Sequence, residues 1–281
     1  MSVATQRKHT FHALAKVIEG NIRMPLVQTI PAQAHAALDP MGGYGVQHTT
    51  DYRLEGLISL SRGHSQVSGC AGNKPGYGWS TLVTTVLEDL NAMQVLMADR
   101  VVGQTITEHP LVGHVPTISF LGTWFDNPRI AGHPIHLNLN LDLIGPKPPN
   151  DAPYIRDPEF LQRVSNQYSS ILGIEDLPED LRKKYNDLAA DLGKTDTVEC
   201  SLVNLASGSY PGRTFGHIIR IPEFGTITLG KLKITQEDPD PVTGSLRKTT
   251  VTLTMVDLKL GCAIEADIPI GTGSSNGTTY P

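Results

Sequence analysis

The chain contains few cysteines and no long apolar run, and each shortage excludes a class of protein. Its 281 residues include only Cys70, Cys200 and Cys262, which lie far apart in the sequence. So sparse a set does not form a disulfide framework and, without a CxxC pair, does not indicate structural zinc. Whether Cys200 and Cys262 are paired stays open. No window approaches about 18 consecutive apolar residues, so we expect no membrane-spanning helix.

Clustered positive charge is also scarce. The formal net charge is −5, and the longest basic run is Arg182-Lys183-Lys184, inside a predicted helix. We interpret this run as the solvated face of that helix, and we expect no nucleic-acid partner because such a protein needs a basic stripe. The first residues carry charges and no apolar stretch of signal length, which predicts a cytoplasmic protein, with non-classical export as the alternative.

Recognisable catalytic and metal-binding motifs are missing as well. The ten histidines include no HExxH motif, and the spacing of His133 and His136 puts them on opposite faces of a strand. We therefore predict no metal, no cofactor and no assigned catalytic residue. A hydrolase is a third hypothesis for the function. It would draw on His64, His109, His114 and Asp99.

Alternating apolar and polar residues are plentiful, together with 27 glycines and 20 prolines that indicate many turns. The sharpest alternation spans residues 136–143 and reads His-Leu-Asn-Leu-Asn-Leu-Asp-Leu. Its leucines share one face, and its polar residues share the other. Because a period of two is typical of a half-buried strand, we predict a strand over this whole run.

Further strands are expected on both sides of this run. Residues 81–104 favour two buried strands that turn near residues 89–91, with a single helix as the competing interpretation. In residues 225–235 and 249–260 the alternation changes parity partway, which predicts a hairpin with a bulge or corner. The other predicted strands span residues 11–23 with a break near Gly20, 52–61, 116–125, 130–144, 197–204 and 217–221.

Two helices interrupt the strands. Asp157-Pro158-Glu159 supplies an N-cap, a proline at the first helical position and an acid in the first turn. An apolar stripe follows until Gly173, and a second amphipathic stretch runs from Pro178 to Gly193. The pattern predicts a helical hairpin at about residues 157–193, inserted into an otherwise β-rich chain.

The fold class that follows is mainly β, an antiparallel β-sandwich or barrel with an inserted helical hairpin. We interpret residues 1–281 as a single domain of this kind. Its last segment, residues 271–281, is rich in Gly, Ser and Thr. Such a tail is ordinarily disordered, and it becomes ordered only where it has a partner to lie against.

Aromatic residues offer the best candidate binding site. Tyr77 and Trp79 are flanked by Gly76 and Gly78 in loop-like sequence, where a sugar-stacking platform would lie, although core packing explains them equally well. Our leading hypothesis is a structural or interaction protein, a β-scaffold that self-associates as a homo-oligomer or docks on another protein. The second hypothesis is a module that binds a carbohydrate or small ligand at Tyr77 and Trp79.

Residues 89–102, followed by residues 119–122, 130–132 and 225–229, occur in the order of similar segments in a known family. In this order of strands, over about half of its length, the chain resembles the bacterial choice-of-anchor P proteins. The resemblance implies an exported, β-rich surface protein of unknown activity and supplies no catalytic residues. The chain departs from that family because it shows no evident signal peptide or C-terminal anchor.

Overall fold

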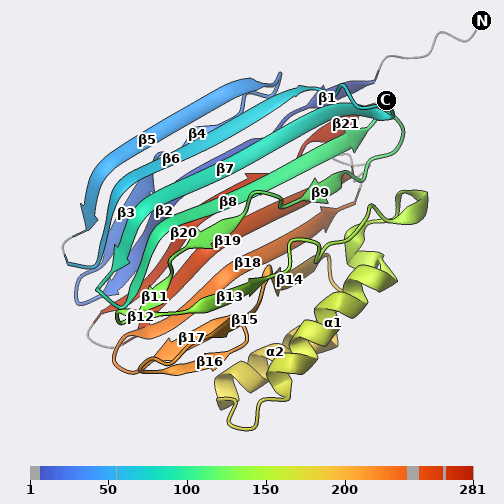
Figure 1. Ribbon diagram of the computed structural model, residues 1–281. Helices are drawn as coiled ribbons and strands as arrows, with labels where there is room; N and C mark the ends of the chain where they lie inside the picture. The colour runs from blue at the N-terminus through green and yellow to red at the C-terminus, as the bar shows by residue number, and fades with distance from the viewer. Residues whose placement is uncertain (1–6, 55, 239–246, 262–263, 281) are drawn as a thin grey trace, which may run out of the picture.

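The computed structural model describes residues 7–54, 56–238, 247–261 and 264–280. Two large antiparallel sheets, here sheet 1 and sheet 2, pack face to face, and two helices lie beside them at one side (Figure 1). Strands β2 and β20 of sheet 2 contact β6, β7 and β8 of sheet 1. Neither sheet closes on itself within the described residues, so the predicted β-rich fold is confirmed in its sandwich form.

Sheet 1 is built around consecutive hairpins, with the strand order β12-β11-β8-β7-β6-β5. Strands β9 and β10 also pair with β8, and β5 forms one edge of the sheet. Its strands are β5 (Gly43–Leu54), β6 (Ile58–Ala71), β7 (Tyr77–Ala92), β8 (Leu96–Pro110), β9 (Thr117–Ser119), β10 (Trp124–Asp126), β11 (Arg129–Ile130) and β12 (His133–Pro134).

Sheet 2 combines the two ends of the chain, with the strand order β16-β17-β18-β19-β20-β2-β3. Strand β14 pairs with the second half of β18, and β4 pairs with β2. Its strands are β2 (Ala13–Met24), β3 (Gln28–Gln33), β4 (Ala36–Ala37), β14 (Thr197–Ser201), β16 (Arg213–Phe215), β17 (Ile218–Ile221), β18 (Gly225–Glu237), β19 (Lys248–Gly261) and β20 (Glu265–Ser275).

The smaller elements connect these sheets. Two further strand pairs form, one between β1 and β21 and one between β13 and β15. None of the described helices is long and apolar enough to cross a membrane. The bounds are β1 (Lys8–Thr10), β13 (His136–Leu139), β15 (Val203–Ser207), β21 (Thr278–Tyr280), the 3-10 turns η1 (Pro149–Asp151) and η2 (Tyr154–Arg156), and the helices α1 (Pro158–Leu172) and α2 (Glu179–Asp191).

The predicted corner in the β18–β19 hairpin is confirmed at Gly230. Cross-strand pairing stops there and resumes on the other side, and Gly230 has a φ of 59°, which a glycine adopts without steric cost. Before the corner Leu229 is buried, and after it Leu232 is buried, so the parity of the inward face changes by one residue. Both halves of β18 therefore keep an apolar face toward the core and a polar face outward.

The helical hairpin is also confirmed. The carboxylate of Asp157 accepts a hydrogen bond of 2.9 Å from the backbone N–H of Phe160, as the N-cap interpretation requires. The buried stripe of α1 includes Phe160, Val164, Tyr168 and Ile171, at helical spacing. Helix α2 follows Pro178 and begins with two acidic residues. Its contacts with sheet 2 form the site described below.

Several strand predictions are wrong in their bounds. The predicted strands 116–125, 130–144 and 197–204 are each divided among shorter strands, because the chain turns at residues 121–122 within the first run and changes its pairing partner within the other two. The run 136–143 is a strand only as far as Leu139, because β13 has a single short partner, β15, and the chain then turns with Leu143 buried. Residues 52–61 are not one strand: residues 52–54 end β5, residues 58–61 begin β6, and the two strands pair as a hairpin. Residues 81–104 do form two strands, but the turn lies at Met93 and Gln94, whose φ angles are 52° and 57°.

The prediction of a disordered tail is wrong for the described residues. Strand β20 extends through Ser275 between β19 and β2, and β21 pairs with β1. The Ser275 hydroxyl lies 2.8 Å from the Thr107 hydroxyl in the interior of the sandwich. The partner that orders this segment is therefore the rest of the same chain. Pro281 lies outside the described residues.

Candidate functional site

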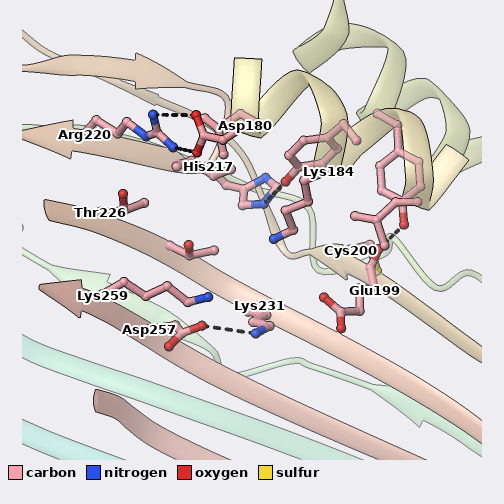
Figure 2. Close-up of a pocket in the computed structure, with 16 residues that line it drawn as sticks. Asp180, Lys184, Glu199, Cys200, His217, Arg220, Thr226, Lys231, Asp257 and Lys259 are labelled. Atoms are coloured by element: carbon pink, nitrogen blue, oxygen red, sulfur yellow. Dashed lines mark hydrogen bonds and ion pairs between the residues drawn. The ribbon is translucent and has the colours of Figure 1, made fainter. Parts of the chain in front are cut away.

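A polar cavity lies where the helical hairpin covers sheet 2. Its volume is about 220 Å³, and α2, β17, β18 and β19 contribute to its walls. On β18 and β19 the residues that face the cavity alternate with buried apolar residues such as Ile227 and Leu258. This alternation turns Thr226 and Lys259 toward the cavity, and the change of parity at Gly230 brings Lys231 to the same face of β18 (Figure 2).

Helix α2 covers the cavity with its amphipathic face. Leu181 and Tyr185, one helical turn apart, are its buried residues. The ammonium of the preceding Lys184 lies 5.7 Å from the centre of the Tyr185 ring, and Figure 2 shows this side chain reaching from the helix toward the strands. The Lys184 residue is exposed, but partial desolvation of its ammonium lowers its pKa below the ordinary value, and the carboxylate of Glu199 partly opposes that shift.

An ion pair joins the start of α2 to sheet 2. Asp180, in the first turn of the helix, accepts two hydrogen bonds from the guanidinium of Arg220 on β17, and the bond from Nη1 to Oδ1 is 3.0 Å long. The hydrogen bond from Arg220 is the main reason that the pKa of Asp180 lies below its usual value. Because the pairing is bidentate, it fixes both the guanidinium plane and the position of the helix above the strands.

His217 is buried beneath the helix. Its Nε2 atom lies 3.0 Å from the hydroxyl oxygen of Tyr185, whereas its Nδ1 atom has no hydrogen-bond partner in the described part of the protein. Burial, followed by the positive charge of Lys184, lowers the pKa of His217 to about 3. The imidazole is therefore neutral near pH 7, and one of its ring nitrogens remains uncommitted in the cavity wall.

The strands add charges of both signs. The ammonium of Lys231 pairs with the carboxylate of Asp257 at 3.1 Å. Among the residues that the structure describes, Lys184 and Lys259 form no ion pair, and neither does Glu199, which lies at the α1 end of the cavity. The cavity is thus lined by the ammonium groups of two exposed lysines that no described carboxylate neutralises by direct contact.

The cavity is better suited to binding than to nucleophilic catalysis. Burial raises the pKa of the Cys200 thiol well above its ordinary value, so the sulfur is protonated and unreactive near neutral pH. Burial likewise raises the pKa of the Tyr168 and Tyr185 hydroxyls, which keeps both neutral. Within the described lining, the remaining charged groups are lysines, an arginine and carboxylates, which recognise ligands by charge.

The residues predicted to bind a ligand lie elsewhere, on β7. Trp79 stacks on His9, with 5.0 Å between ring centroids and 15° between the ring planes, and packs against a small hydrophobic cluster. The Tyr77 hydroxyl lies 3.0 Å from Oγ1 of Thr117, and the ammonium of Lys74 lies 4.5 Å from the centre of the Tyr77 ring. The protein itself therefore occupies part of both rings, and a glycan platform at these two residues stays a prediction.

The residues considered for a hydrolase are dispersed. Asp99 and His109 both lie on β8, ten residues apart, which corresponds to about 33 Å along a strand. His109 is buried against His9, with 4.5 Å between ring centroids, while His64 lies on β6 and His114 in the loop after β8. Among the described residues, no three His, Cys, Asp or Glu side chains form a group that could hold a metal ion. Cys262 lies outside the described residues.

The cavity residues were missed by sequence reasoning. The interpretation of Arg182, Lys183 and Lys184 as a solvated face holds for the exposed Lys183 and Lys184, although Figure 2 shows the side chain of Lys184 reaching from the helix toward the cavity. The available signal was the polar alternation of β18 and β19 opposite an amphipathic helix. That signal does not reveal which polar face the helix covers.

A family model described as Domain of unknown function (DUF8256) matches residues 9–235 of the chain. Comparison with curated proteins and with solved structures gave no match. The resemblance to the choice-of-anchor P proteins therefore stays a prediction.

Proposed function

Because the chain belongs to the DUF8256 family, whose model describes a domain of unknown function, we propose a function from the site itself: this protein binds a small anionic ligand in the cavity beneath α2. The observation that carries the proposal is the pair of ammonium groups of Lys184 and Lys259. They line one cavity and form no ion pair with a described residue. A phosphate or carboxylate group placed between them would supply the missing negative charge.

Neighbouring groups support the same ligand chemistry. Thr226 and Thr228 also line the cavity and form no side-chain hydrogen bond within the described protein, so their hydroxyls can donate to an anion. Arg220 and Lys231 add positive charge, although carboxylates already pair with both. The carboxylate of Glu199, which is close enough to Lys184 to oppose the fall in its pKa, lies beside Cys200, and its negative charge directs the anion toward Lys259.

Titration with inorganic phosphate at constant ionic strength tests this proposal. We expect binding heat and a rise in melting temperature for the wild type, and at least a fivefold weaker affinity for Lys184→Ala and Lys259→Ala. Lys233→Ala is the matched control, because Lys233 is an exposed lysine on β18, the strand beside β19, and does not line the cavity. Equal phosphate affinity in all four proteins, or no affinity in any, would refute an anion site here.

A second candidate function is the β-scaffold that self-associates, and strand β5 favours it. This edge strand is 12 residues long, pairs only with β6 in the described structure, and is exposed or half-buried along its length. It contains neither lysine nor proline, two residues that commonly protect an edge from pairing with another strand, and its pairing with β6 is interrupted at Asp51 near one end. An exposed edge of this kind can add a strand from a second copy or another protein.

The oligomeric state tests this second candidate. Light scattering coupled to gel filtration should detect a species larger than the 281-residue monomer, with a fraction that rises with concentration. Tyr44→Lys and His48→Lys introduce charge at exposed positions of β5 and should return the protein to monomer. Lys substitution of the exposed Leu205, on β15, is the control. A wild type that stays monomeric at high concentration would exclude self-association through this edge.

A further inference from the structure

We propose that the ligand of this cavity is an amphiphile, with its anionic headgroup between Lys184 and Lys259 and its apolar body in a groove that adjoins the cavity. This inference rests on the proposed anion-binding function and adds the chemical class of the rest of the ligand. It predicts a monomeric single-chain alkyl phosphate or carboxylate, or a molecule of equivalent shape, rather than a free inorganic ion.

The groove lies around the turn that connects β17 to β18. Its volume is about 700 Å³, and the ends of β16 and β19 complete it. Much of its lining is apolar and includes Phe215, Ile221, Pro222, Phe224 and Leu260. Pro222 is exposed, and the other four side chains are largely buried, so they form the floor of the groove rather than a protruding patch. A hydrocarbon body would cover this apolar floor.

The cavity and the groove meet at a common wall. Arg220, Thr226 and Lys259 line both spaces, so a ligand whose charged end contacts Lys259 can continue directly into the groove. The pairing with Asp180 holds the Arg220 guanidinium at this junction. The Nε atom of Arg220 is buried and has no hydrogen-bond partner among the described residues. The junction therefore presents hydrogen-bond donors immediately before the lining becomes apolar.

The charges around the groove agree with an amphiphile oriented in this direction. Asp180 pairs with Arg220, and Asp257 pairs with Lys231. Among the described residues, the cavity therefore keeps the ammonium groups of Lys184 and Lys259 against one unpaired carboxylate, that of Glu199. The described groove lining adds the carboxylate of Glu223 and no further unpaired cation. At the same end, the Arg213 guanidinium lies 5.3 Å from the centre of the Phe215 ring and pairs with Asp176 at 3.1 Å, so its charge is already engaged. An anionic headgroup is therefore favoured in the cavity, and the apolar body is left for the groove.

Three probes test the inference on the full chain: inorganic phosphate, octyl phosphate kept below its micelle concentration, and octanol. Octyl phosphate should bind at least tenfold more tightly than inorganic phosphate, since burial of two methylene groups already corresponds to about that factor. Octanol should bind more weakly than octyl phosphate. Lys184→Ala should weaken octyl phosphate binding at least fivefold, which would show that the headgroup occupies the cavity.

Groove variants separate this inference from the proposed function. Ile221→Asn should remove the tenfold advantage of octyl phosphate and leave inorganic phosphate binding unchanged. Pro222→Asn is the second variant, because the exposed Pro222 can be replaced with little risk to folding. If both phosphates bind equally well, the amphiphile is excluded and the anion site stands; if neither binds, the proposed function itself fails. Binding to vesicles of anionic lipid without binding to monomeric octyl phosphate would instead indicate a membrane surface and overturn the inference.

Discussion

Removal of the Tyr185 hydroxyl should destabilise the protein through the buried histidine beneath it. Tyr185 and His217 are 2% and 4% exposed, and their hydroxyl oxygen and Nε2 atom are 3.0 Å apart. In Tyr185→Phe the ring packing is kept, but His217 is left with neither ring nitrogen bonded to a described group, since Nδ1 already lacks a partner. The cost of leaving such a buried polar atom unpaired is about 1–3 kcal/mol in the free energy of unfolding.

Urea denaturation at pH 7, with the melting temperature as a second readout, measures this loss. For a domain of this size about 1 kcal/mol corresponds to a fall of roughly 2–4 °C. His217→Leu should cost a similar amount, because it leaves the Tyr185 hydroxyl buried and unpaired. In the double variant Tyr185→Phe/His217→Leu both partners are apolar, so no polar atom is left unpaired. Its loss of stability should therefore be smaller than the sum of the two single losses by about 1 kcal/mol or more.

Two results would contradict this reasoning. A loss below about 0.5 kcal/mol in Tyr185→Phe would mean that water from the adjacent cavity satisfies His217 without the hydroxyl. Strictly additive losses in the double variant would mean that the two side chains stabilise the fold independently. Lys183→Ala is the matched control on α2, because its ammonium forms an exposed pair with Asp187, which contributes little to stability.

Other predictions concern pH, packing and capping. Burial lowers the pKa of His109 and of His217 to about 3 in the folded state, whereas a histidine in the unfolded chain has a pKa of about 6.5. Below about pH 6.5 these two histidines are therefore protonated in the unfolded state and neutral in the folded state. The free energy of unfolding should fall between pH 7 and pH 5 by about 2 kcal/mol per histidine. Urea midpoints that do not change over this range would refute it. Gly20→Ala should cost about 1–3 kcal/mol, because its Cβ would lie 2.5 Å from the backbone oxygen of Asp267; calorimetry that shows no loss would contradict this. Asp157→Ala should lower the free energy of unfolding by about 1 kcal/mol, because it removes the N-cap of α1. Asp157→Ser keeps a capping oxygen, so its melting temperature should lie close to that of the wild type.

Local sequence signals predicted those parts of the fold that depend on neighbouring residues. Asp157 and Pro158 place the start of α1 because capping and a fixed φ act within one turn of chain. The parity change around Gly230 predicts the corner of β18, since the inward face must remain apolar on both sides of it. The same logic failed in residues 136–143, where the alternation is real but a partner strand is available only as far as Leu139. Pairing with a distant strand, rather than local alternation, decides where a strand ends.

The sequence by itself determined the class of the fold, the helical hairpin and the corner of the β18–β19 hairpin, because each follows from residue spacing within a short stretch of chain. The tertiary structure alone decided the candidate site. Lys184, His217 and Lys259 belong to three separate segments, and they line one cavity because α2 packs across the outer face of sheet 2. The apolar residues that hold α2 on sheet 2 come from segments far apart in the sequence. No residue spacing therefore predicts which charged side chains this packing brings together.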